Sequence, residues 1–146
     1  MGVLVAIWRK RVHRGPMDSL QQVQLQAGQG MQGNTDVGGR RQVTIIEREV
    51  WQQHMAALGG SLDPSARRAN LMISGCALRD SRGRVLQIGS SRVRILGETK
   101  PCERMEEALP GLRDRMRPDW GGGAFGEVLD DALIAVGDVV RWEQDP

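Results

Sequence analysis

Short apolar runs separated by glycine- or proline-containing turns recur along the whole chain, and this pattern constrains the fold more than any other. The turns come about every eight to twelve residues, a spacing that is typical of β-barrels and β-sandwiches. Residues 21–27 alternate apolar residues with glutamines, as a strand with one face in solvent does. Strands are expected at residues 3–8, 21–27, 42–46, 70–74, 85–88, 92–98, 124–129, 133–135 and 139–142.

Few segments have helical periodicity. Residues 47–58 repeat apolar residues at helical spacing and end at a glycine pair, so the longest helix is expected there. His54 lies on the apolar side of that helix and is interpreted as a packed histidine rather than a ligand. A short helix is expected at residues 103–109, with turns at 64–67 and 112–116. The chain of 146 residues is predicted to form a single mainly β, barrel-like domain spanning residues 1–146.

The composition argues against two classes of partner. The net charge is only +2, and one Phe, four Trp and no Tyr provide no row of aromatic side chains for base stacking, so no nucleic-acid partner is expected. The apolar residues 1–7 are too short to span a membrane and lack the pattern of a signal peptide, so no membrane is expected either. A cytoplasmic protein is predicted, in which Cys76 and Cys102 stay reduced. With His13 and His54, these cysteines do not have the spacing of a zinc site.

A Pro-Cys pair at the junction of an expected strand and an expected helix is the main candidate for chemistry. Cys102 directly follows Pro101, and Lys100 and Arg104 lie within two residues of it. Positive charges and a helix start favour the thiolate, the form that attacks electrophiles and binds soft metals. The residues alone leave equally open that Cys102 is a small apolar residue that closes a turn. Cys76 follows a glycine among small residues and is interpreted as structural.

Four stretches of the sequence, one of which contains the Pro-Cys pair, occur in a recognisable order. They are the glycine-rich GQGMQGNTDVGGRRQV at 28–43, RRANL at 67–71, TKPC at 99–102 and the block that begins Gly-Gly-Gly at 121–138. Together these stretches resemble the MOSC domain, the module named after the C-terminal part of molybdenum cofactor sulfurases. The resemblance spans nearly the whole chain. It implies a barrel of mixed strands, of the kind also found in pyruvate kinase, with one longer helix and a few short helices.

The resemblance implies that the protein binds the molybdenum cofactor and is an oxidoreductase component that reduces N-hydroxylated compounds. Cys102 would be the catalytic residue and the molybdenum ligand, and an external reductase would supply electrons. Guanidinium, amide and backbone N–H groups suit the phosphate of the cofactor's pterin. The implied cofactor-binding residues are Arg41, Arg68, Asn70, Lys100, Gly122 and Gly123. Because an anionic ligand needs such donors around a thiolate, Arg41, Arg68, Asn70 and Cys102 are expected to line one cavity.

Two other functions stay open at this point. In the first, Cys102 carries sulfur as a persulfide that it receives from a cysteine desulfurase, and pyridoxal phosphate belongs to that partner rather than to this chain. In the second, the domain is an interaction module whose Cys102 is inert. The chain also departs from the family at three places. Asn34 and Asp36 stand where the family has an acid and a histidine, and residues 131–132 replace a glycine pair. The sequence does not indicate the substrate or the oligomeric state.

Overall fold

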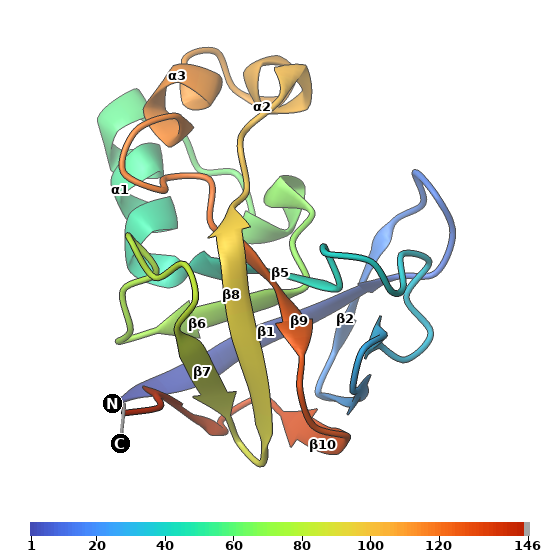
Figure 1. Ribbon diagram of the computed structural model, residues 1–146. Helices are drawn as coiled ribbons and strands as arrows, with labels where there is room; N and C mark the ends of the chain where they lie inside the picture. Colours follow the sequence, from blue (N-terminus) through green and yellow to red (C-terminus); the bar gives the residue numbers. More distant parts are fainter. Residues whose placement is uncertain (145–146) are drawn as a thin grey trace.

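Seven strands close into a barrel because β1 (Gly2–Lys10) pairs with both β6 (Leu71–Ser74) and β11 (Val139–Trp142). The computed structural model describes residues 1–144 of the chain (Figure 1). Around the barrel the order is β11, β7 (Val85–Ile88), β8 (Ser91–Glu98), β9 (Ala124–Val128), β5 (Val43–Glu47), β6 and β1. Strands β5 and β6 run parallel and all other neighbours run antiparallel. The prediction of a mainly β barrel of mixed strands is confirmed.

The apolar alternation of the strands fills the barrel. In β8, Val93 and Ile95 point into the main core, whereas Arg94 between them is exposed. In β6 all four residues are buried, because Met72 packs on the outside with Trp8 and Ile46 in a second cluster. Strands covered on both faces have continuous apolar runs rather than alternation. This explains why the sequence from 71 to 73 shows no polar residue.

The remaining strands lie beside the barrel. Strand β2 (Met17–Leu20) extends the sheet by pairing with the far end of β1, and β10 (Ala132–Ala135), β3 (Gln22–Gln26) and β4 (Gly30–Met31) form a separate sheet. The sequence predicts β3 and β10, but not β2 or β4. Strand β2 has no apolar alternation, and β4 is only two residues long within the glycine-rich segment.

The helices gather at one end of the barrel, as Figure 1 shows. They are α1 (Arg48–Leu58), the 3₁₀ helix η1 (Pro64–Arg67), α2 (Glu103–Ala108) and α3 (Leu112–Met116). Trp51 and Met55 of α1 share a small core with Met105, Leu112 and Met116. The longest helix begins one residue after its predicted start and ends at Leu58, as predicted, with Gly59 as its cap at a left-handed φ of 64°. Within residues 1–144, no helix combines the length and the apolar character that crossing a membrane requires.

Candidate functional site

A polar cavity opens where the glycine-rich segment passes over β1 and β5. We call it the amide cavity because two asparagines form part of its wall, and its volume is about 110 Å³. Five separated segments contribute to it: the end of β1, Met17 at the start of β2, the glycine-rich segment, β5 and the residues just before β6. The polar lining residues are Lys10, Asn34, Asp36, Arg41, Thr44, Arg68 and Asn70.

Asn70 is buried, and its side chain is fully hydrogen-bonded within the protein. Its Nδ2 donates to the Trp8 carbonyl at 3.3 Å and to Asn34 Oδ1 at 3.4 Å. Its Oδ1 accepts from the backbone N–H of Thr44 at 3.1 Å and from the Thr44 hydroxyl at 3.3 Å. Asn34 Oδ1 also accepts from the N–H of Lys10 at 2.9 Å. The two amides therefore fasten the glycine-rich segment to β1 and β5, and a ligand would have to displace one of these bonds to be held by Asn70.

Three positive side chains reach the amide cavity. The Arg41 guanidinium lies over the Phe125 ring, 5.4 Å from its centroid, and Lys10 Nζ pairs with Asp36 at 3.0 Å. Arg68 donates from Nη2 to the Gly15 carbonyl at 2.6 Å. Arg41, Arg68 and Asn70 thus lie around one cavity, as the sequence predicts, although they come from separate stretches of the chain.

Cys102 does not line the amide cavity, so the expectation that it shares that cavity with Arg41, Arg68 and Asn70 is wrong. It is exposed and occupies the N-cap position of α2, where its carbonyl accepts the Met105 N–H at 3.0 Å. The α2 side chain that turns toward the cavities is Arg104. It lines an adjoining space of about 220 Å³, which we call the cationic cavity, with Lys10, His13, Arg14 and Arg68. Lys100 is exposed and lines neither cavity.

Arg67 is a site residue that sequence reasoning missed. Its Nε donates to the Gly122 carbonyl at 3.0 Å and its Nη2 to the Thr99 carbonyl at 3.4 Å. Arg67 therefore joins η1 to the 99–102 stretch that carries Cys102 and to the glycine block that begins at 121. Burial lowers the pKa of Arg67, while the charge of Cys102 acts in the opposite direction. RRANL contains two adjacent arginines, and nothing in the sequence distinguishes the one that braces the Cys102 segment from the one that lines the cavities.

Gly122 and Gly123 lie where two backbone segments approach closely. The Thr99 hydroxyl donates to the Gly122 carbonyl at 2.6 Å, and the Thr99 N–H donates to the Gly123 carbonyl at 2.9 Å. A Cβ atom on Gly122 would lie 2.1 Å from the Thr99 carbonyl oxygen, which leaves room for no side chain. Packing is therefore enough to explain both glycines, and their role in cofactor binding stays a prediction.

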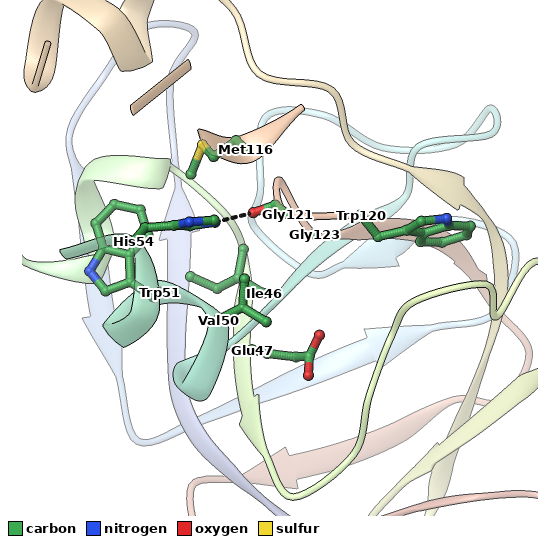
Figure 2. Close-up of a pocket in the computed structure, with 9 residues that line it drawn as sticks. All are labelled: Ile46, Glu47, Val50, Trp51, His54, Met116, Trp120, Gly121 and Gly123. Carbon is green, nitrogen blue, oxygen red and sulfur yellow. Dashed lines mark hydrogen bonds between the residues drawn. The ribbon is translucent and has the colours of Figure 1, made fainter. Parts of the chain in front are cut away.

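His54 packs inside the protein, as its position on the apolar side of α1 predicts. It is 4% exposed, and Figure 2 shows its ring pointing from α1 to the Gly121 carbonyl, which lies 2.8 Å from Nε2. A carbonyl only accepts hydrogen bonds, so Nε2 carries the proton, and Nδ1 has no partner among residues 1–144. Burial lowers the pKa of His54, more strongly than the hydrogen bond to Gly121 raises it.

This lowered pKa predicts a pH dependence of stability. Below the unfolded-state pKa of about 6.5, His54 is protonated in the unfolded chain but stays neutral in the native protein until the pH is lower. Stability therefore falls as pH falls, by at most about 1.4 kcal/mol per pH unit. His54→Gln removes the titrating group but keeps a donor for the Gly121 carbonyl. We expect urea unfolding at pH 7.5 and 5.5 to show a smaller loss of stability in His54→Gln than in wild type. An equal loss in both proteins would contradict this role.

The two cysteines differ in access. Cys76 is 8% exposed, its Sγ contacts the Val140 carbonyl at 3.5 Å, and burial raises the pKa of its thiol. Cys102 is exposed. We expect iodoacetamide at neutral pH to label Cys102 at least about tenfold faster than Cys76, because the thiolate is the form that reacts and the reagent must reach it. Peptide mass mapping of the folded protein measures both rates, and equal or faster labelling of Cys76 would overturn this prediction.

These features define a small barrel of mixed strands that presents a Pro-Cys thiol beside positively charged cavities. The MOSC domain pattern matches residues 9–141, and the chain belongs to the MOSC domain family. No curated protein matches the sequence. Among residues 1–144, no three His, Cys, Asp or Glu side chains group together to hold a metal ion.

Solved structures share this fold at low sequence identity. YuaD from Bacillus subtilis is 17% identical, with a TM-score of 0.77 over 96% of this chain and 94% of that one. YiiM from Geobacillus stearothermophilus is 16% identical, with a TM-score of 0.77 over 99% of this chain and 76% of that one. YiiM from Escherichia coli is 12% identical, with a TM-score of 0.74 over 99% and 71%. These likenesses show the fold alone.

Proposed function

We propose that this MOSC-domain protein binds the molybdenum cofactor and that Cys102 is the protein ligand of the metal. The observation that carries the proposal is the exposed Cys102 thiol at the N-cap of α2, the helix whose Arg104 lines the cationic cavity. A thiolate is a soft ligand that suits molybdenum. The protein would act as an oxidoreductase component for N-hydroxylated compounds.

The residues present fit the cofactor's phosphate. Arg41 and Arg68 offer guanidinium groups, which bind phosphate through paired N–H donors, and the charge of Lys10 is offset by Asp36. A volume of about 110 Å³ accommodates a phosphate-sized group, since a water molecule takes about 30 Å³. Arg41 and Arg68 would hold the phosphate, Lys100 would add positive charge near the thiol, and Asn70 would keep the cavity wall in shape. Arg67 would fix the backbone that carries Cys102.

When bound, the cofactor would supply the electron transfer that reduces the substrate, and an external reductase would renew its electrons. The chain's own part is to hold the cofactor and to present the Cys102 thiolate. We place the protein in the cytoplasm, where both cysteines stay reduced, and we expect neither nucleic acid nor a membrane as partner.

A second candidate function is favoured by the exposure of Cys102. A thiol at the surface can be reached by the persulfide of a partner enzyme, a cysteine desulfurase that uses pyridoxal phosphate. Attack of the Cys102 thiolate on the outer sulfur would transfer that sulfur and release the partner's thiolate. Cys102 would then carry a persulfide for the assembly of a metal–sulfur cofactor.

Metal analysis and intact mass separate these functions. The protein is produced in a host that makes the cofactor and is purified without reductant. About one molybdenum per chain would support cofactor binding. A mass increase of one sulfur atom without molybdenum would support the sulfur carrier. A protein with neither bound molybdenum nor an added sulfur atom would contradict both proposals.

A further inference from the structure

A further cavity is lined by α1, by α3 and by the two loops 75–84 and 117–123. We call it the α1 cavity. Its volume is about 360 Å³, within the roughly 300–1,000 Å³ that is typical of small-molecule sites. The described residues that line it include none that line the amide cavity or the cationic cavity. The proposed function therefore leaves this cavity without a role.

Four charged side chains line the α1 cavity, and only two of them neutralise each other. Arg79 Nη2 pairs with Asp119 at 3.0 Å, and this ion pair joins one loop to the other. Within residues 1–144, Glu47 and Arg115 form no ion pair, either with each other or with another side chain. The cavity thus presents one uncompensated carboxylate and one uncompensated guanidinium.

Glu47 carries the negative charge where β5 ends and α1 begins. Its carboxylate is half-buried and accepts the Leu78 N–H at 3.2 Å, and Figure 2 shows it beside Val50 and His54. Burial raises the pKa of Glu47, more than the bond from Leu78 lowers it. A desolvated carboxylate is stabilised by a cation that pairs with it. An ammonium group in the cavity would supply that cation.

Arg115 carries the positive charge and comes from α3. Its guanidinium has paired N–H donors, which match the two oxygens of a carboxylate. Burial, and to a smaller degree the charge of Arg115, lowers the pKa of His54. The His54 ring therefore stays neutral near pH 7, and adds no charge to those of Glu47 and Arg115.

The loops that line the α1 cavity are held in unusual conformations. Asp119 and Trp120 are consecutive residues with left-handed φ values of 58° and 61°, and for a residue as bulky as tryptophan such a φ is an outlier. Backbone strain of this kind persists only where the surrounding structure enforces it, and it is frequent at ligand sites. With the ion pair between Arg79 and Asp119, it fixes the cavity before a ligand arrives, which reduces the entropy lost on binding.

We propose that the α1 cavity binds a free α-amino acid with a small apolar side chain. The ammonium group pairs with Glu47, the carboxylate pairs with Arg115, and the apolar side chain contacts Val50 and Pro118. A ligand with both charges compensates both side chains, whereas an amine or a carboxylic acid leaves one of them unpaired. This inference is independent of the proposed function, because none of the residues assigned to the cofactor lines this cavity.

L-Valine serves as the probe, and two analogues each lack one of its charged groups. Isobutylamine has no carboxylate, and isovalerate has no ammonium group. We expect isothermal titration calorimetry of the full chain to show that wild type binds L-valine, and binds each analogue at least about tenfold more weakly, the scale of a lost charge-assisted hydrogen bond. Failure of wild type to bind L-valine would overturn the proposal, and so would equal affinity for L-valine and either analogue.

Variants locate the site. Glu47→Gln keeps an acceptor for the Leu78 N–H, and Arg115 is exposed, so Glu47→Gln and Arg115→Gln should both fold, which circular dichroism checks. We expect each to bind L-valine at least about tenfold more weakly than wild type. The matched controls, Glu107→Gln and Arg117→Gln, remove the same charges from exposed positions outside the cavity and should bind like wild type. Equal binding in Arg115→Gln and wild type would overturn the proposal even if Glu47→Gln did not fold, and so would equal weakening in the controls.

Discussion

Cys102→Ser is expected to lose nearly all bound molybdenum while the barrel stays folded. The two side chains are almost the same size, and Cys102 is exposed, so packing changes little. A serine hydroxyl stays protonated near neutral pH and is a harder donor than a thiolate, so it is a poor ligand for a soft metal site. Elemental analysis for molybdenum, with circular dichroism as the test of folding, measures both parts of the expectation.

Cys76→Ser is the matched control. It makes the same chemical change at the second cysteine, which is buried against the barrel core. We expect it to lower stability, because a hydroxyl replaces an apolar group there, but to keep its molybdenum. Equal molybdenum in wild type and Cys102→Ser would end the ligand hypothesis, and so would equal loss in the two serine variants.

The strands that form the barrel could be predicted because local patterns of apolar residues indicate which of their faces are buried. In β8 buried residues alternate with more exposed ones, because one face of the strand is covered, whereas β6 is buried on both faces and its sequence from 71 to 73 is continuously apolar. Strand β2 left no such signal, since Met17–Leu20 contains two polar residues in its middle and gains its structure from pairing with β1. This pairing depends on how far β1 extends beyond the barrel, and no local sequence pattern predicts that.

The site could be predicted only as a set of motifs. The motifs predict that Arg68 and Asn70 share a cavity with Arg41, and they do, but the sequence could not show that the Asn70 side chain is hydrogen-bonded to Trp8, Asn34 and Thr44. Nor could it show that the α2 side chain facing the cavities is Arg104. Side-chain direction at a helix end depends on the tertiary packing of the helix, here on the small core that α2 shares with α1 and α3.

His13 and Arg14 are the clearest case of a site contribution hidden from the sequence. They lie in a short turn between two strands, where charged residues are ordinary. The bond from Arg68 to the Gly15 carbonyl joins that turn to the end of η1. This contact joins positions far apart in the chain, so neither motif nor periodicity could reveal it.

Gly122→Ala is expected to lower the free energy of unfolding by about 3 kcal/mol or more, at the upper end of what overpacking does. The new Cβ would lie 2.1 Å from the Thr99 carbonyl oxygen, and a backbone atom cannot rotate away as a side chain can. The Thr99 segment would have to move, which weakens its bonds to the 122–123 segment and displaces Cys102 three residues later. Urea unfolding measures the stability.

The matched control for Gly122→Ala is Gly39→Ala, another glycine-to-alanine change. Gly39 has a left-handed φ of 65°, but a Cβ there would meet no atom within 4 Å. Backbone strain alone then predicts a loss of about 1–2 kcal/mol, with unchanged labelling of Cys102. Gly122→Ala should differ in both respects, because displacement of the Thr99 segment also changes the rate at which iodoacetamide labels Cys102. Equal stability of the two variants would show that the Thr99 segment moves aside freely, and Gly122 would then not hold Cys102 in place.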